Sequence, residues 1–163
     1  MTNEVSLEAM LNAREQRASV INQLQQDFPH QTIISFKLNI PGPIKNTPDY
    51  QWAFRQGMNC LTGIAECYLE EITNLTGPEA YLISNQDAET VKKQMVLIED
   101  EHPLGRLFDL DVVSVNRQDL GLSPRKCLLC DQDAHACSRS RNHTLETVLE
   151  TINQIITAAY QSE

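Results

Sequence analysis

Apolar residues recur along the chain at spacings that predict alternating helices and strands. Residues 6–27 place them about 3.6 positions apart, which is typical of an amphipathic helix. Residues 32–40 alternate and are rich in β-branched side chains, so they predict a strand, which runs into a breaker at residues 41–43 (PGP). The helical spacing returns in residues 50–72 and again in residues 144–160.

The middle of the chain predicts shorter elements. We expect a strand over residues 79–84, a short helix over residues 87–93 and a further strand over residues 94–100. A turn leads from there into the strand 105–113 (GRLFDLDVV), which we expect to pair with the preceding strand as a hairpin. This order of elements predicts an α+β fold with helices packed against one mixed β-sheet.

Length and composition narrow the class of protein. A chain of 163 residues fits one compact domain spanning residues 1–163. No uninterrupted apolar segment approaches the roughly 20 residues needed to cross a bilayer. The start of the chain carries Glu4 and Glu8 and lacks a basic region followed by an apolar one. We therefore expect a cytoplasmic protein with no membrane partner.

The charge of the chain is unevenly distributed. A net charge of −9 argues against general affinity for nucleic acid, which requires lysines and arginines to neutralise phosphates. Between Glu101 and His143, however, six basic residues balance six acidic ones, so the deficit lies outside this window. Such a window fits a local site for an anionic ligand, although solvated surface arginines would give the same balance.

Asp109 and Asp111 are the first candidate site residues. In a strand, residues two apart project from one face, so both carboxylates would point the same way. Two like charges held this close need a cation, and Mg²⁺ prefers carboxylate oxygens together with water and phosphates. The alternative is a solvated turn, but the flanking residues are apolar rather than Gly, Asn, Ser or Pro. The pair therefore points to phosphate-ester chemistry.

Residues 117–143 form a polar segment with little periodicity and a second set of candidate ligands. Cys127 and Cys130 have the CxxC spacing that suits tetrahedral zinc, and Cys137 with His143 would complete a Cys₃His set. The second half of this set is compressed compared with ordinary zinc fingers. Two alternatives stay open: reduced thiols without a metal, or a Cys–His nucleophile pair that lacks an evident orienting group.

Taken together, several segments resemble one known family over nearly the whole chain. They are residues 14–17 (REQR), 35–36 (SF), 41–45 (PGPIK), 105–112 (GRLFDLDV), 124–130 (PRKCLLC), Ala134, Cys137, 139–141 (RSR) and His143. In this order and spacing they resemble the apo-citrate lyase phosphoribosyl-dephospho-CoA transferases, also called citrate lyase holo-acyl-carrier-protein synthases.

The resemblance implies a nucleotidyltransferase-like fold and a transfer reaction. Such an enzyme takes the phosphoribosyl-dephospho-CoA group from 2′-(5″-triphosphoribosyl)-3′-dephospho-CoA. It attaches this group to a serine of the apo form of the citrate lyase acyl carrier protein and releases diphosphate. This chemistry agrees with the phosphate site expected around Asp109 and Asp111, because nucleotidyl transfer depends on positioning and on charge stabilisation.

The resemblance also assigns roles to individual residues. Asp109, Asp111 and Arg106 are the expected catalytic residues: the two aspartates would hold Mg²⁺, with Glu99 or Glu101 of the preceding strand as a third ligand, and Arg106 would bind phosphate. The expected substrate ligands are Gly42, Lys45, Arg125, Lys126, Arg139 and Arg141. The plainer alternatives are a solvated lysine at Lys45 and a salt bridge from Arg106 that only shields the aspartates.

Two other functions compete with this interpretation. One is a small zinc-stabilised protein-interaction module, which predicts stoichiometric zinc and no role for Asp109 or Asp111. The other is an equivalent transferase that modifies another carrier, such as that of malonate decarboxylase. A test of carrier modification separates all three.

Overall fold

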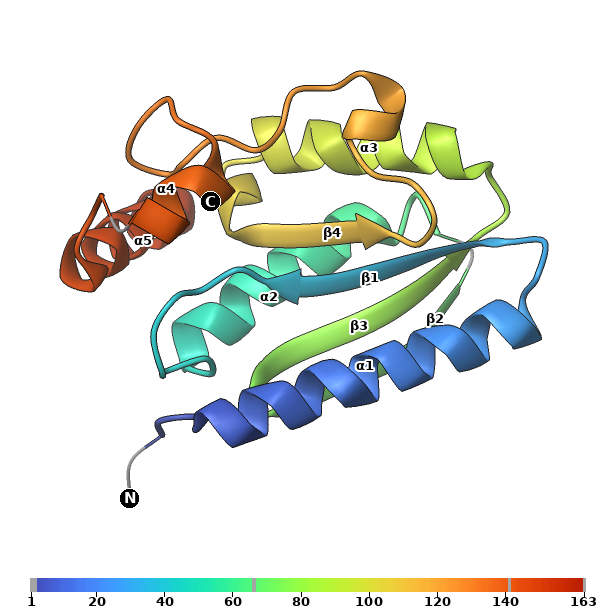
Figure 1. Cartoon of the computed structure of the whole chain (residues 1–163), viewed down its shortest axis with the longest axis horizontal. Helices are drawn as coiled ribbons and strands as arrows, with labels where there is room; N and C mark the ends of the chain where they lie inside the picture. The colour runs from blue at the N-terminus through green and yellow to red at the C-terminus, as the bar shows by residue number, and fades with distance from the viewer. Residues whose placement is uncertain (1–2, 66, 141, 163) are drawn as a thin grey trace.

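A four-stranded antiparallel sheet forms the centre of the structure (Figure 1). This computed structural model describes residues 3–65, 67–140 and 142–162, and only the backbone of residues 67–73. In sheet order the strands are β2 (Cys67–Asn74), β3 (Gly77–Ser84), β1 (Thr32–Leu38) and β4 (Phe108–Val112). The expected α+β class is confirmed. The sheet is not mixed as expected, because every pairing of the described strands is antiparallel.

Helices cover both faces of the sheet. The helices are α1 (Leu7–Asp27), α2 (Pro48–Leu61), α3 (Ala88–Glu101), α4 (Ala134–Ser140) and α5 (Leu145–Gln161), with short 3₁₀ turns η1 (Gly105–Leu107) and η2 (Gln118–Leu120). Leu24 of α1 packs on Ile33 and Tyr81 on one face. The larger hydrophobic cluster on the other face receives side chains from α2, α3 and α5. Among the described residues, no helix is both long and apolar enough to cross a membrane.

Side chains at the helix starts explain where four helices begin. Ser6, Thr47, Asp87 and Thr144 each accept a hydrogen bond from the backbone N–H three residues later. Each bond satisfies an N–H group that has no partner within its own helix. The expected helices at residues 6–27 and 144–160 are confirmed within one residue at each end.

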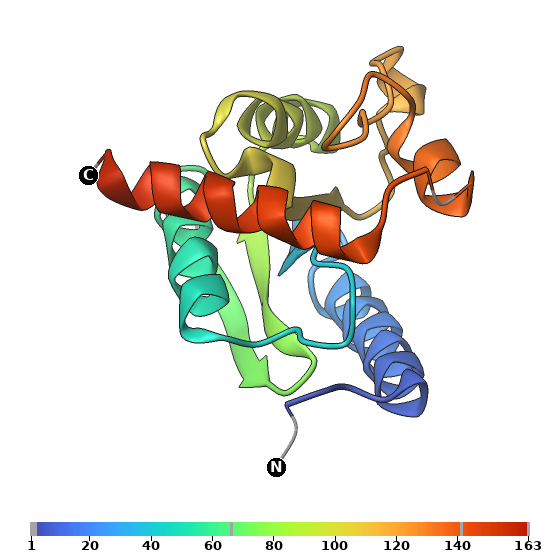
Figure 2. The same cartoon turned by 90° about the vertical axis from the view of Figure 1, so that its left-hand side faces the viewer.

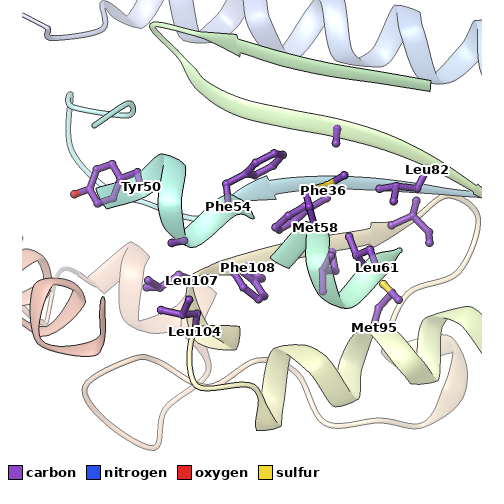
Figure 3. Packing of buried hydrophobic residues seen from close by; sticks show 14 of the residues in the cluster. Phe36, Tyr50, Phe54, Met58, Leu61, Leu82, Met95, Leu104, Leu107 and Phe108 are labelled. Atoms are coloured by element: carbon purple, nitrogen blue, oxygen red, sulfur yellow. The ribbon is translucent and has the colours of Figure 1, made fainter. Parts of the chain in front are cut away.

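Three aromatic rings join β1 to its neighbours in the core (Figure 3). Phe36 stacks on Phe54 of α2 with 4.7 Å between ring centroids, and it meets Phe108 of β4 edge-on at 5.3 Å. Helix α5 runs from the cysteine-bearing segment (residues 117–140 and 142–143) toward α2 (Figure 2), where Tyr160 contacts Trp52. Offset and edge-on aromatic pairs of this kind add to the stabilisation from burial.

The predicted helix over residues 50–72 is wrong in its second half. Helix α2 ends at Leu61, and β2 begins at Cys67 and pairs with β3. Gly63 lies in the turn that follows the helix, and glycine weakens helices because its backbone loses more freedom on ordering. The apolar residues beyond this turn therefore belong to a strand.

The predicted short helix 87–93 and strand 94–100 are one helix, α3. Its buried positions are Val91, Lys92, Met95, Val96 and Glu99, which have helical spacing. Two members of this stripe are charged, so the apolar residues alone do not display the helical period. Because no strand precedes β4 directly, the predicted hairpin is also wrong, and β4 pairs with β1.

Close packing at Gly105 generates a stability prediction. A Cβ atom at this position would lie 2.2 Å from the carbonyl oxygen of Ile98 and 2.5 Å from that of Glu99. These atoms belong to the backbone of α3 and cannot move aside cheaply. We expect Gly105→Ala to lower the free energy of unfolding by about 2 kcal/mol or more, measured by urea denaturation.

Gly63→Ala is the matched control, because a Cβ atom there meets nothing within 4 Å. A Gly105→Ala variant as stable as Gly63→Ala would contradict the tight packing of η1 against α3.

Candidate active site

Both candidate aspartates lie on the face of the sheet that α1 partly covers. In the β1–β4 pairing, Asp109 is opposite Lys37 and Asp111 is opposite Ser35. The alternate residues Phe108, Leu110 and Val112 point into the core and are buried. The prediction that the two carboxylates share one face is confirmed.

Charge is crowded around this pair. Lys37 Nζ donates a hydrogen bond to Asp109 Oδ2 at 2.7 Å. The pKa of Asp111 is raised, first because it loses part of its solvation and second because Asp109 repels its charge. Among the described residues, the one salt bridge to this pair joins Lys37 to Asp109 and leaves Asp111 without one, so the donor set fits a hard cation such as Mg²⁺.

Glu99 and Glu101 were expected on a strand beside the aspartates. They lie instead at the end of α3. Glu99 is 3% exposed and accepts a hydrogen bond from the backbone N–H of Leu110 at 2.9 Å. It also pairs with Arg117 at 2.8 Å and with Arg125 at 3.6 Å. Both of its oxygens therefore have partners at the edge of β4. Glu101 is exposed.

Arg106 and Arg125 bind backbone carbonyl groups. Arg106 Nη2 donates to the carbonyl oxygens of Lys126 at 2.9 Å and Cys127 at 2.6 Å. Arg125 Nη1 donates to Phe108 O at 2.7 Å, and its Nη2 donates to Arg106 O at 2.9 Å. The two guanidinium groups thus tie the cysteine-bearing segment to the start of β4. The sequence had predicted contacts of these arginines with phosphate or with the aspartates, and it did not predict these contacts with the backbone.

A large cavity lies beside these arginines, and we call it the cysteine-side cavity. It has a volume of about 790 Å³ and lies between η1, the cysteine-bearing segment and α5. Of the predicted site residues, it brings together Gly42, Arg106, Arg125, Lys126, Cys127, Cys137 and His143. Arg139 is exposed on α4 and does not line it. Arg141 lies outside the described residues.

A smaller cavity of about 240 Å³, which we call the basic cavity, lies on the α1 side of the sheet. It contains Lys45, which sequence reasoning expected as a substrate ligand, together with Lys37. It also contains Arg14 and Arg17, which were not expected as site residues. Two signals were available: both arginines belong to the 14–17 (REQR) segment that resembles the family, and their i, i+3 spacing places both on one helix face.

The expected zinc ligands come together. The ligand atoms of Cys127, Cys130, Cys137 and His143, which we call the thiol cluster, all lie within 4.8 Å of one another. Cys130 Sγ is 3.7 Å from Cys137 Sγ, and His143 Nε2 is 3.5 Å from Cys130 Sγ. These four residues could hold a metal ion.

The backbone shapes the thiol cluster. The Cys127 N–H donates to Gln132 O at 2.7 Å, which closes a tight turn around the CxxC pair, and the Leu129 N–H approaches Cys127 Sγ at 3.4 Å. Although partial burial acts against it, the Leu129 N–H and next the Cys137 thiol lower the pKa of the Cys127 thiol. Burial, and next the neighbouring Cys127 and Cys130 thiols, raise the pKa of the Cys137 thiol to about 11. Helix α4 supplies Cys137 in its first turn and so completes the group with His143.

Comparisons with known proteins identify relatives of this chain. The model of the apo-citrate lyase phosphoribosyl-dephospho-CoA transferase family matches residues 5–159. A protein of Streptococcus pyogenes serotype M5 (strain Manfredo), named "probable apo-citrate lyase phosphoribosyl-dephospho-CoA transferase", is 34% identical over 171 residues, which cover 98% of this chain and 89% of that protein.

Two further relatives show the same relationship. A Vibrio cholerae serotype O1 (strain M66-2) protein of the same name is 39% identical over 135 residues, 76% of each chain. "Protein CitXG" of Leuconostoc mesenteroides subsp. cremoris is 37% identical over 163 residues, which cover 93% of this chain and 35% of that protein. The chain therefore belongs to the apo-citrate lyase phosphoribosyl-dephospho-CoA transferase family.

Proposed function

We propose that this protein attaches the phosphoribosyl-dephospho-CoA group to a serine of the citrate lyase acyl carrier protein. The donor is 2′-(5″-triphosphoribosyl)-3′-dephospho-CoA, and the second product is diphosphate. Family membership supports the reaction, and it favours citrate lyase over another carrier or a purely structural zinc module. We further propose that residues 1–163 act as one transferase domain, because α2, α3 and α5 share one hydrophobic cluster.

The observation that carries this proposal is the pair Asp109 and Asp111 on one open sheet face, beside a cavity lined with cations. The serine oxygen attacks the α-phosphorus and forms a phosphodiester bond. The bond from that phosphorus to the oxygen bridging to the β-phosphate breaks, and diphosphate leaves with the electron pair. The serine proton passes to solvent. No electron donor or further reactant is required.

The described residues around the aspartates have distinct roles in this proposal. Asp109 and Asp111 would hold Mg²⁺, which when bound lowers the pKa of the attacking hydroxyl and offsets charge on the leaving group. Lys37 fixes Asp109 through its 2.7 Å contact. Arg106 and Arg125 hold the wall of the cysteine-side cavity, where we place the dephospho-CoA part with Gly42 and Lys126.

We propose Zn²⁺ as the occupant of the thiol cluster. Zinc–ligand bonds of about 2.3 Å to sulfur and 2.0–2.1 Å to nitrogen give tetrahedral edges of about 3.8 Å and about 3.6 Å. The observed 3.7 Å between Cys130 and Cys137 and 3.5 Å between His143 and Cys130 agree with these edges. With four protein ligands the ion is structural, and it would fix the segment that Arg106 binds.

The direct test of function is modification of the carrier. Purified protein is incubated with apo acyl carrier protein of citrate lyase, the triphosphoribosyl donor and Mg²⁺, and the intact mass of the carrier is measured. We expect a mass gain of one phosphoribosyl-dephospho-CoA group, lost when the acceptor serine is replaced by alanine. An unchanged carrier mass would contradict the proposed function.

The metal-binding role of the aspartates predicts a loss of rate without a loss of fold. We expect Asp109→Asn and Asp111→Asn each to lower the transfer rate by about 100-fold or more, measured by the same mass assay over time. Both side chains are at least partly exposed, so the variants should unfold at nearly the wild-type urea concentration.

Asp49→Asn, at an exposed position in the first turn of α2, is the control for the change in net charge, and it should transfer at the wild-type rate. A near-normal rate for either Asp109→Asn or Asp111→Asn would remove the metal assignment.

The zinc assignment predicts one zinc atom per chain in protein purified without chelators. We expect Cys130→Ser to lose most of this zinc because it removes one of four ligands, as measured by elemental analysis. Co²⁺ in place of zinc should give the visible absorption of a tetrahedral thiolate site. Cys60→Ser, outside the cluster on α2, is the matched control and should keep its zinc. Wild-type protein with far less than one zinc atom would refute the assignment.

A further inference from the structure

The basic cavity is built from three separate parts of the chain. Met10, Arg14 and Arg17 reach it from α1, and residues 37–40 form its side at the end of β1. Lys45 and residues 76–79, at the start of β3, close it. The i, i+4 and i, i+3 spacing of the three α1 residues places them on one helix face. These side chains therefore converge from different elements on a single volume of about 240 Å³.

The cavity carries more positive than negative charge. Two of its cations have carboxylate partners: Arg17 pairs with Glu79 at 2.5 Å, and Lys37 pairs with Asp109 at 2.7 Å. For Arg14 and Lys45, the described part of the chain shows no carboxylate within salt-bridge distance. Once the two pairs are balanced, the lining keeps two positive charges.

Lys45 is held where an anion would stabilise it. Its ammonium group donates a hydrogen bond to the carbonyl oxygen of Ile40. Burial, and next the charge of Lys37, lower the pKa of Lys45. A cation that has lost part of its hydration without gaining a counter-ion is costly. A bound anion would remove that cost and would also favour the charged form.

Backbone packing fixes this side of the cavity. Gly77 has φ +108°, and a Cβ atom there would lie 3.0 Å from Lys45 O, so only glycine fits this close approach. Asn46 Nδ2 also donates to Asn74 O at 2.8 Å, which ties the loop after β1 to the β2–β3 turn. The Lys45 side of the cavity is therefore preorganised, and Arg14 reaches the cavity from an exposed position on α1.

The cavity is also next to the aspartates. Lys37 on β1 is opposite Glu79 on β3 and opposite Asp109 on β4, so one row of charged residues crosses the sheet from the cavity to the candidate metal ligands. A phosphate chain bound in the cavity would thus extend toward a cation held by Asp109 and Asp111.

We propose that the basic cavity binds the β- and γ-phosphates of the donor, which leave together as diphosphate, with Arg14 and Lys45 as phosphate ligands. This inference rests on the proposed transfer reaction and adds to it the location of the leaving group. Arg14, which belongs to the 14–17 (REQR) segment but had no predicted role, would then be a substrate-binding residue. Arg14 and Lys45, which have no carboxylate partner in the described part of the chain, supply two positive charges for a ligand with two phosphates.

The test is to measure the binding of inorganic diphosphate by isothermal titration calorimetry, at fixed ionic strength and without added Mg²⁺. We expect wild-type protein to bind diphosphate more tightly than orthophosphate. Arg14→Gln should weaken diphosphate binding about tenfold or more, because it removes one charge-assisted contact. Lys45→Gln should have a similar effect.

Arg55→Gln and Lys93→Gln are matched controls, because both side chains are exposed on helices α2 and α3 and line neither cavity. They should bind diphosphate like wild type, which excludes a general effect of net charge. Equal affinity in Arg14→Gln and Arg55→Gln, or no preference for diphosphate over orthophosphate, would overturn the inference.

This outcome is separate from the outcome of the carrier assay. If wild type modifies the carrier but Arg14→Gln binds diphosphate as tightly as wild type, the subsite is refuted and the proposed function stands. Arg14-dependent diphosphate binding without carrier modification would refute the function and support the cavity as a diphosphate site.

Discussion

The pairing of β4 with β1 is the constraint on which the site depends. Because side chains alternate along a strand, this register sends Phe108 and Leu110 into the core and leaves Asp109 and Asp111 on the opposite face. A shift of one residue would bury both carboxylates and expose the apolar residues. The aromatic contact between Phe36 and Phe108 therefore stabilises the core and, through the same register, sets the direction of the candidate metal ligands.

A buried ionic group at the edge of β4 extends this constraint to the cysteine-bearing segment. Glu99 of α3 accepts the Leu110 N–H and pairs with Arg117 and Arg125. Arg125 in turn binds carbonyl groups at the start of β4, and Arg106 binds those beside Cys127. Because removal of one member of a buried ionic group leaves its partners without compensation, these residues act as a unit. Order at the thiol cluster and order at the aspartates are thus linked through protein contacts.

Local patterns in the sequence predicted local features well. The spacing in residues 6–27 and 144–160 and the shared face of Asp109 and Asp111 needed only neighbouring residues, and the structure agrees with each. Features that depend on distant partners were not predictable in this way. Lys92 and Glu99 interrupt the apolar period of α3, because each is buried against a backbone partner on β4. Arg17 binds Glu79, which is 62 positions away in the sequence.

In the proposed reaction, Asp109 and Asp111 hold a divalent cation next to a diphosphate in the basic cavity. The most direct measurement is a crystal structure of the protein with Mn²⁺ and inorganic diphosphate, with Mn²⁺ located by anomalous scattering. We expect an anomalous peak coordinated by Asp109 and Asp111, with diphosphate density in contact with Arg14 and Lys45. A Mn²⁺ peak away from both aspartates, or diphosphate bound only in the cysteine-side cavity, would contradict it.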